Sequence, residues 1–176
     1  RFSLPLTTTG ATILVRATSP LTTRAELERP GLRIAVNRGG HLERVARSLF
    51  PNARIEAVDG NAAVPGRLAA DLADAVLTDD LEAPRWQAQL PPTLAIGPLT
   101  RDRKAAWLPV ESAALVADFD RWLIATEASG ELARLRARHG LDAARTAEPL
   151  AALLARLDER LALMPAVARA KQRLDR

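Results

Sequence analysis

Two hydrophobic patterns alternate along the first hundred residues. Short apolar, β-branched runs bounded by turn residues are typical of buried strands, and they cover residues 12–17, 32–36, 53–58, 75–77 and 93–96. Apolar positions at helical spacing lie between them, over residues 42–49 and 62–72. Strands that alternate with helices at this spacing predict βαβ units and a parallel sheet. We therefore expect an α/β lobe over residues 20–98, with any ligand beyond the carboxyl ends of its strands.

The pattern changes after Pro109. Residues 113–128 have the spacing of an amphipathic helix, and Gly130 interrupts it before helical spacing resumes over residues 132–138. The apolar face predicted for the first of these helices consists of Leu115, Phe119, Trp122 and Leu123.

A long helix is predicted from Leu150 onwards, after a weak linker over residues 142–149. Its apolar positions repeat in steps of four and three, as in one helix of a bundle or coiled coil. They are Leu150, Leu154, Leu157, Leu161, Met164 and Ala168, and Lys171 continues the same spacing. One helix cannot bury such a face by itself, so we expect its partner helices to lie elsewhere.

Composition excludes several classes of protein. The chain of 176 residues is 48% apolar, which is enough for a core, and 25 basic against 21 acidic residues give a net charge of +4 without a basic block. Aromatic residues make up 3%, too few for a stacking platform on single-stranded nucleic acid. Cysteine is absent and only two histidines occur, so we expect no disulfide, no metal site and no cofactor. No apolar run is long enough to span a membrane.

Two turns carry candidate chemistry. Asn37-Arg38-Gly39-Gly40 joins a predicted strand to a helix start, where glycines and free N–H groups suit a carboxylate ligand, although a plain turn is the commoner reading. Thr78-Asp79-Asp80-Leu81-Glu82 follows another strand at the same predicted edge. Crowded acids there could include a protonated general acid. Alternatively, Asp80 or Thr78 caps the next helix and Glu82 is a first-turn residue.

A set of short motifs resembles one family over residues 2–141. The motifs are Phe2-Ser3-x-Pro5 with Gly10-x-Thr12, Val36-Asn37-x-Gly39-Gly40-x-x-Glu43-Arg44, Asn61, Ala73-Asp74, Thr78-Asp79-x-x-Glu82-Ala83, Lys104-Ala105-x-x-Leu108-Pro109, and Trp122-Leu123 with Gly130. In this order and at these distances they resemble the extracytoplasmic cyclohexadienyl dehydratases. These enzymes have the type 2 periplasmic solute-binding fold and are related to amino-acid-binding proteins. The resemblance implies that residues 1–19 and 99–141 are the remainder of a first lobe and a hinge.

The resemblance also implies roles for the two turns. Prephenate or arogenate would lose carbon dioxide and hydroxide, with Glu82 as the general acid and Asn37 as a hydrogen-bonding partner of the substrate. Gly39 and Gly40 would hold a substrate carboxylate, with His41, Thr78 and Asp79 also in the substrate-binding set. The family usually has Thr at position 41 and often Asn at position 42, whereas this chain has His41 and Leu42. His41 is therefore either a replacement donor or an exposed first-turn residue.

The C-terminal helix resembles the first helix of a secreted, all-helical chorismate mutase. The matching residues are Asp158-Glu159-Arg160-Leu161-x-Leu163-Met164-x-x-Val167-Ala168-x-x-Lys171. The resemblance implies that Arg160 and Lys171, three turns apart, clamp the substrate. Residues 150–176 would then be the incomplete start of a fused mutase that produces prephenate. Without its other helices, that part of the chain is expected to be inactive.

Two other functions stay open at this point. The chain could belong to an extracellular solute-binding protein for an amino acid or small organic anion, feeding a transporter or sensor. A helical interaction module is a third alternative, but it rests only on residues 150–176. The resemblance predicts a periplasmic protein whose signal peptide and first lobe precede Arg1. The expected partner is a small molecule, with no nucleic acid, and the oligomeric state is open.

Overall fold

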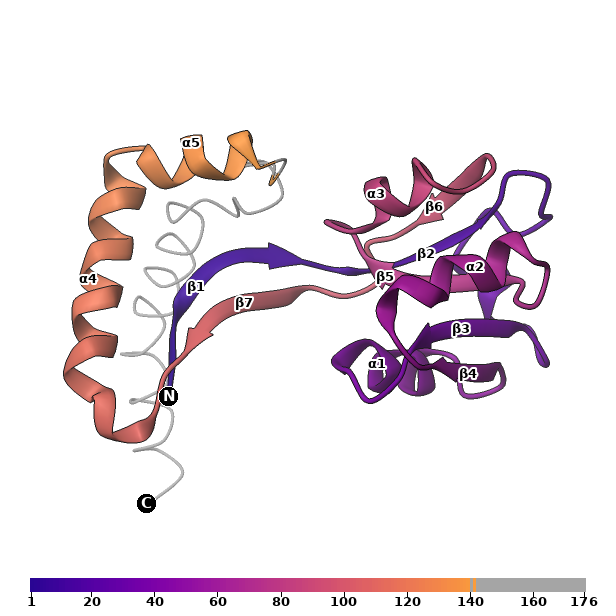
Figure 1. Ribbon diagram of the computed structural model, residues 1–176, viewed down its shortest axis with the longest axis horizontal. Helices are drawn as coiled ribbons and strands as arrows, with labels where there is room; N and C mark the ends of the chain where they lie inside the picture. Colours follow the sequence, from indigo (N-terminus) through magenta and orange to yellow (C-terminus); the bar gives the residue numbers. More distant parts are fainter. Residues whose placement is uncertain (140, 142–176) are drawn as a thin grey trace, which may run out of the picture. The chain divides into compact units, whose positions relative to one another are not determined.

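The computed structural model describes residues 1–139 and 141 (Figure 1). The chain divides into two compact units, Arg1–Ala125 and Thr126–Arg176. We distinguish two parts of the first unit. The sheet region is residues 10–100, and the ribbon region is residues 1–9 together with 101–125. The predicted helix over residues 150–176 lies outside the described residues, as do Arg160 and Lys171.

The sheet region contains five strands in the order β4-β3-β5-β2-β6. Their bounds are β2 (Ala11–Arg16), β3 (Arg33–Asn37), β4 (Arg54–Val58), β5 (Ala75–Asp79) and β6 (Thr93–Ile96). β3 pairs in parallel with both β4 and β5, as the βαβ pattern predicts. β2 is antiparallel to both of its neighbours, so the sheet is mixed and the prediction of a parallel sheet is wrong for this strand. The reason is that β2 enters the sheet directly from the preceding strand, with no helical crossover to impose a parallel direction.

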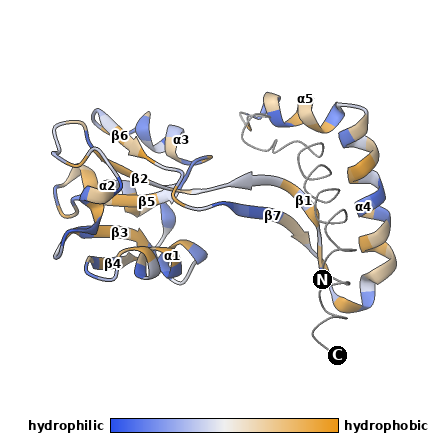
Figure 2. Ribbon diagram, turned by 180° about the vertical axis from the view of Figure 1, so that it is seen from behind, coloured by the Kyte–Doolittle hydropathy of each residue, from blue (hydrophilic) through white to orange (hydrophobic). Residues whose placement is uncertain are grey.

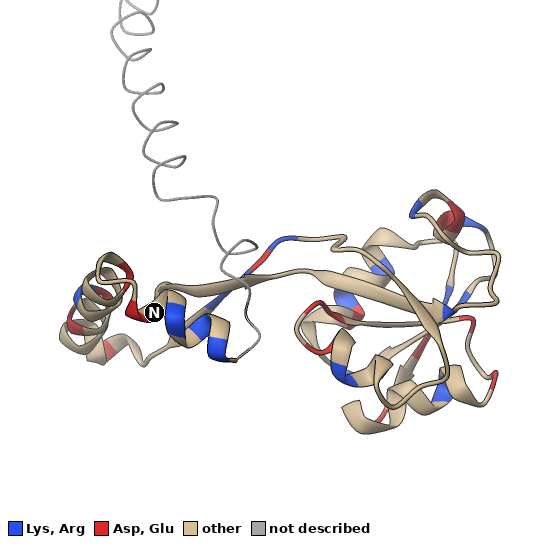
Figure 3. Cartoon of the chain, turned by 90° about the horizontal axis from the view of Figure 1, so that it is seen from above, with Lys and Arg blue, Asp and Glu red and all other residues tan. Residues whose placement is uncertain are grey.

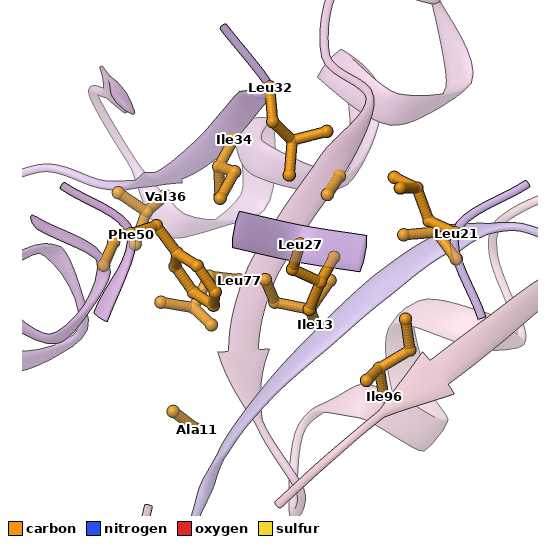
Figure 4. Packing of buried hydrophobic residues seen from close by; sticks show 13 residues of the cluster. Ala11, Ile13, Leu21, Leu27, Leu32, Ile34, Val36, Phe50, Leu77 and Ile96 are labelled. Carbon is orange, nitrogen blue, oxygen red and sulfur yellow. The ribbon is translucent and has the colours of Figure 1, made fainter. Parts of the chain in front are cut away.

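Both faces of this sheet are buried. Successive strand residues point to opposite faces, so Ile13 belongs to one hydrophobic cluster and Leu14 to the other. The first cluster packs against α1 (His41–Leu49) and includes Leu27 of a short 3₁₀ segment (Figure 4). The second packs against α2 (Val64–Ala69) and α3 (Ala83–Gln87), with Trp86 almost fully buried. Burial on both faces explains why the strands read as continuous apolar runs.

The ribbon region contains two strands and a helix. β1 (Phe2–Thr9) pairs antiparallel with β7 (Asp102–Trp107), and α4 (Ala113–Ala128) follows. The bounds of α4 match the predicted helix, and within it Leu123 is buried and Phe119 stacks on Trp122 with ring centroids 5.5 Å apart. Leu115 of the same predicted face is 55% exposed. Phe2 and Trp107, on β1 and β7, are also largely exposed. Figure 2 shows how apolar and polar positions are distributed over these elements.

The sheet and ribbon regions join where the chain passes twice through a narrow point. The Ala11 N–H donates to Thr100 Oγ1 at 2.8 Å, and the Leu99 N–H donates to the Ala11 carbonyl at 2.7 Å. A Cβ atom on Gly10 would collide with the Thr100 carbonyl oxygen and with Cβ of Pro98. Glycine at position 10 is thus what allows the two passes of the backbone to approach so closely.

The described part of the second unit is short. Gly130 has φ 74° and ends the preceding helix, as predicted, and α5 (Glu131–Arg138) follows. Arg136, 8% exposed, pairs with Glu127 at 2.8 Å. Among the described residues, no helix is long and apolar enough to cross a membrane.

Candidate functional site

The two candidate turns lie at one edge of the sheet. β3, β4 and β5 are parallel and end at Asn37, Val58 and Asp79. Asn37 is paired with Val58 in the register of β3 and β4. Because the carboxyl ends of parallel strands meet at the same edge, the turns that follow all three strands converge there.

Glu82 is held at this edge by two side chains from separate segments of the chain. Asn61, which follows β4, donates from Nδ2 to Glu82 Oε1 at 2.6 Å. Thr78, on β5, donates from Oγ1 to Glu82 Oε2 at 2.7 Å. Thr78 is fully buried, and its cross-strand partner on β2 is Thr12. Both carboxylate oxygens are therefore fixed, and the half-buried Glu82 has a defined orientation.

The other two acids of the cluster face different groups. Asp79 Oδ1 accepts the N–H groups of Leu81 and Glu82 at 3.1 and 2.9 Å, and Asp79 Oδ2 lies 3.8 Å from Nζ of Lys104. Asp80 is buried, and its Oδ1 accepts the Gly10 N–H at 3.2 Å. The three carboxylates are thus separated. The prediction that Asp80 or Thr78 caps the next helix is wrong, because Asp79 satisfies the N–H groups ahead of α3.

The glycine turn ahead of α1 already holds a carboxylate of the chain itself. Gly39 has φ +75°, and its N–H donates to Glu43 Oε2 at 2.7 Å. This hydrogen bond, followed by that from Arg47, lowers the pKa of Glu43 below its usual value. Gly40 is the N-cap residue of α1, with no side-chain cap. In this structure the Gly39 N–H is therefore occupied by a carboxylate of the chain itself, and the predicted ligand carboxylate at this turn stays a prediction.

The next two residues differ in their surroundings. The half-exposed side chain of His41 lies with Nε2 3.3 Å from Asp102 Oδ1 on β7. Leu42 is half-buried and packs against the first hydrophobic cluster. Asn37 is half-buried at the end of β3, and its side chain makes no hydrogen bond within the described part of the chain.

The structure adds residues that sequence reasoning left without a role. Asn61 was part of the family pattern, and its position three residues after β4 could have indicated it. Asp102 and Lys104 come from β7, far along the chain, and no local pattern connects them to the turns.

Over residues 1–139 and 141, no group of three or more His, Asp or Glu side chains could hold a metal ion. Charges of both signs are interspersed over the described elements (Figure 3).

Comparison with known sequences gives one informative relative. No family model matches the chain. The cyclohexadienyl dehydratase of Pseudomonas aeruginosa is 33% identical over 147 residues, covering 80% of this chain and 54% of that protein. The chain is thus homologous to cyclohexadienyl dehydratase, and it spans about half of that relative's length.

Comparison with solved structures identifies the fold. An ancestral amino-acid-binding protein, described as a precursor of cyclohexadienyl dehydratase, matches with a TM-score of 0.68 and 24% identity. The match covers 78% of this chain and 60% of that one. A putative binding component of an ABC transporter from Wolinella succinogenes, complexed with lysine, matches with a TM-score of 0.70 and 20% identity, over 78% and 61% of the two chains. The fold is that of the periplasmic amino-acid-binding proteins, with its mixed sheet.

Proposed function

We propose that this chain supplies part of the active site of a cyclohexadienyl dehydratase, with Glu82 as the general acid and Asn37 as a substrate-binding residue. The observation that carries the proposal is the orientation of Glu82, whose two oxygens are held by Asn61 and Thr78 at the carboxyl edge of the sheet. Homology to the dehydratase supports the same reaction. Because the chain spans about half of that relative, the activity of the whole protein is part of the proposal.

The proposed reaction is an elimination that forms an aromatic ring. The bond from the ring of prephenate or arogenate to its carboxylate breaks and releases carbon dioxide, and its electron pair forms a new ring double bond. The ring C–O bond breaks on the opposite side, and the hydroxyl leaves as water with a proton from Glu82. Thr78 suits both forms of Glu82, because a hydroxyl can donate to the carboxylate and accept from the carboxylic acid.

The remaining predicted binding residues have distinct parts in this proposal. Gly39 and Gly40 present the start of α1 to a substrate carboxylate, which would compete with Glu43 for the Gly39 N–H. Within residues 1–139 and 141, the side-chain amide of Asn37 at the same edge makes no hydrogen bond. His41, Thr78 and Asp79 contribute mainly by holding these turns in place, since each is engaged by another side chain or by the backbone.

We also propose the predicted arrangement of the parts. Residues 20–98 form the second lobe together with β2 (Ala11–Arg16), which lies between β5 and β6 in its sheet. The rest of residues 1–19, with 99–141, belongs to the hinge and to the remainder of the first lobe, and residues 142–149 form a linker. A periplasmic location is proposed because similar structures include periplasmic binding proteins, such as an arginine-transport protein from Legionella pneumophila.

An amino-acid-binding protein is the second candidate function, and the structural neighbours favour it. One of them was crystallised with lysine, and a Streptococcus pneumoniae substrate-binding protein was crystallised with L-arginine. An ionised Glu82, oriented by Asn61 and Thr78, would attract the ammonium group of such a ligand. The same carboxylate therefore serves binding when it is charged and catalysis when it carries a proton.

The substitution Glu82→Gln separates the two functions in the natural full-length protein. Formation of phenylpyruvate from prephenate should fall on the order of a hundredfold or more, because the proton donor is lost, while prephenate still binds. The matched control is Glu28→Gln, an exposed glutamate in the same region, which should leave turnover unchanged. Tight amino-acid binding by the unsubstituted protein, with no turnover of prephenate, would reject the dehydratase in favour of the binding protein.

A fused chorismate mutase is a further proposal, and it concerns residues outside the described part of the chain. Its support is the spacing of Arg160 and Lys171, which would place both on one side of the helix that the sequence predicts there. In the full-length protein, Arg160→Ala should strongly reduce chorismate turnover, because a charge placed for the transition state is lost. Dehydratase turnover of the same variant should stay nearly intact. Unchanged mutase activity would refute the role of Arg160, and equal loss of both activities would indicate unfolding.

A further inference from the structure

Both turns that carry the proposed site residues touch a strand that is not part of their sheet. That strand is β7 of the ribbon region. Its first residue, Asp102, lies with Oδ1 3.3 Å from Nε2 of His41, the first residue of α1. Two residues further on, Nζ of Lys104 lies 3.8 Å from Oδ2 of Asp79. Alternate residues of a strand face the same side, so one face of β7 presents an anion to one turn and a cation to the other.

The contact of Lys104 reaches Glu82 through Asp79. Asp79 uses its second oxygen to accept the backbone N–H groups of Leu81 and Glu82. One carboxylate therefore fixes the turn that carries Glu82 and also meets the ammonium of β7. The Asp79 side chain is 21% exposed and that of Lys104 is 46% exposed, so the carboxylate of this pair is partly shielded from water while the ammonium is not. A change in the position of Lys104 relative to β5 would be transmitted to the backbone of Glu82.

The contact of Asp102 reaches the glycine turn through His41. Thr100 Oγ1 donates to Asp102 Oδ2 at 2.9 Å and itself accepts the Ala11 N–H. The carboxylate of Asp102 is thus fixed at the junction of the two regions, and its other oxygen meets His41. Because His41 follows Gly39 and Gly40 directly, this contact locates the start of α1.

We propose that Asp102 and Lys104 are positioning residues, which act through His41 and Asp79 to hold the glycine turn and the Glu82 turn in a fixed relation to each other. The conformation of β7 then determines the geometry of the site, although β7 contributes no group to the chemistry. The effect on turnover rests on the proposed dehydratase function, whereas the coupling between β7 and the two turns does not.

The coupling can be measured in the 176-residue chain by NMR. Lys104→Met should shift the backbone amide signals of Leu81 and Glu82, and Lys104→Arg should restore them because it keeps the charge. Arg103→Met is the matched control, since Arg103 is an exposed neighbour on the other face of β7. Shifts at Leu81 and Glu82 no larger than those of the control would overturn the role of Lys104.

The contact between Asp102 and His41 can be tested with His139 as an internal reference. The sequence contains only two histidines, His41 and His139, so the ring signals form two sets. Asp102→Asn should move the His41 ring signals and leave those of His139 in place. Unchanged His41 signals would overturn the role of Asp102.

Turnover distinguishes this inference from the function on which it rests. In the full-length protein, Lys104→Met should lower kcat roughly two- to fivefold with little change in KM, and Lys104→Arg should restore it. A change in KM alone would overturn positioning of the acid by Lys104. An unsubstituted protein without turnover, whose Leu81 and Glu82 signals still respond to Lys104→Met, would support the coupling and overturn the dehydratase.

Discussion

The sheet region and the ribbon region use apolar residues in opposite ways. Of the buried hydrophobic residues among those described, all but Val116, Leu123 and Leu132 belong to the sheet region. The large hydrophobic residues that are more than half exposed all belong to the ribbon region; they are Phe2, Trp107, Val110, Leu115 and Ile124. The sheet region thus has a complete core of its own, whereas the ribbon region leaves much of its apolar surface uncovered. The residues of the proposed site belong mostly to the sheet region, which is the region with a hydrophobic core of its own.

The largest expected difference between the two regions comes from a matched pair of isoleucines. Ile13 is fully buried in the first hydrophobic cluster, and Ile124 of α4 is 58% exposed. Ile13→Ala should lower the free energy of unfolding by about 2–5 kcal/mol, because it leaves a cavity. Ile124→Ala should change it by no more than about 0.5 kcal/mol. Urea denaturation followed by circular dichroism measures both, and equal losses would contradict the comparison.

A smaller effect is expected where the regions meet. Gly10→Ala places a Cβ against the Thr100 carbonyl and Pro98, and should cost about 1–3 kcal/mol in overpacking. Gly66, in α2, has open space around it and serves as the control. Gly66→Ala should stabilise the protein by about 0.5–1 kcal/mol, because glycine is a poor helix former. Thermal unfolding compares the two variants; a gain in stability from Gly10→Ala would show that the junction is not tight.

The smallest expected effect is the contribution of the ion pair between Arg33 and Asp74 to stability, and it depends on pH. Arg33 donates to both carboxylate oxygens of Asp74, and its side-chain hydrogen bonds lower the pKa of Asp74, while partial burial opposes the shift. Because the pKa is lower in the folded state, the pair stabilises the protein above the ordinary aspartate pKa of about 4. This contribution is lost as the pH falls below about 4 and on through the folded-state pKa.

Asp74→Asn should therefore cost about 1–2 kcal/mol at neutral pH and progressively less in acid. The control is Asp118→Asn on α4, which breaks an exposed pair with Arg121 and should change stability by less than about 0.5 kcal/mol. Urea denaturation over a series of pH values tests both. A constant difference between Asp74→Asn and the unsubstituted protein down to strong acid would exclude the role of this pair.

The sequence predicted the strands that are buried on both faces of the sheet, and it did not predict the exposed strands of the ribbon region. Residues such as Ile13, Leu14 and Val15 are buried on both sides of the sheet, so their strand is visible as an apolar run. β1 and β7 were missed because the ribbon is polar and exposed over much of its length, which leaves no alternation to detect. The direction of β2 could not be predicted either, since a strand buried on both faces has the same pattern whether it is parallel or antiparallel.

The same distinction applies to the candidate site. Thr78, Asp79 and Glu82 are neighbours in sequence, so their cluster was visible, and the carboxyl-end rule placed it correctly beside the glycine turn. Glu43 is the third residue of α1, a position where a glutamate side chain often accepts a backbone N–H group at the helix N-terminus. That position could have indicated its hydrogen bond to Gly39. Asn61, Asp102 and Lys104 reach the site from separate segments. The position of Asn61 after β4 was a usable signal, but the contacts of Asp102 and Lys104 depend on tertiary structure, which one sequence without its fold does not reveal.

The close approach of the chain at Gly10 and Thr100 also means that the sheet region is one continuous segment with adjacent ends. All five sheet strands lie in one uninterrupted stretch of chain, and the two ends of that stretch are joined by the hydrogen bond from Ala11 to Thr100. A segment with its own core and with adjacent ends can be excised, transplanted or circularly permuted without cutting a strand pairing. The segment that can be exchanged in this way carries the glycine turn and Glu82 with it. The proposed site residues can therefore be moved between scaffolds separately from β7, the strand that we propose positions them.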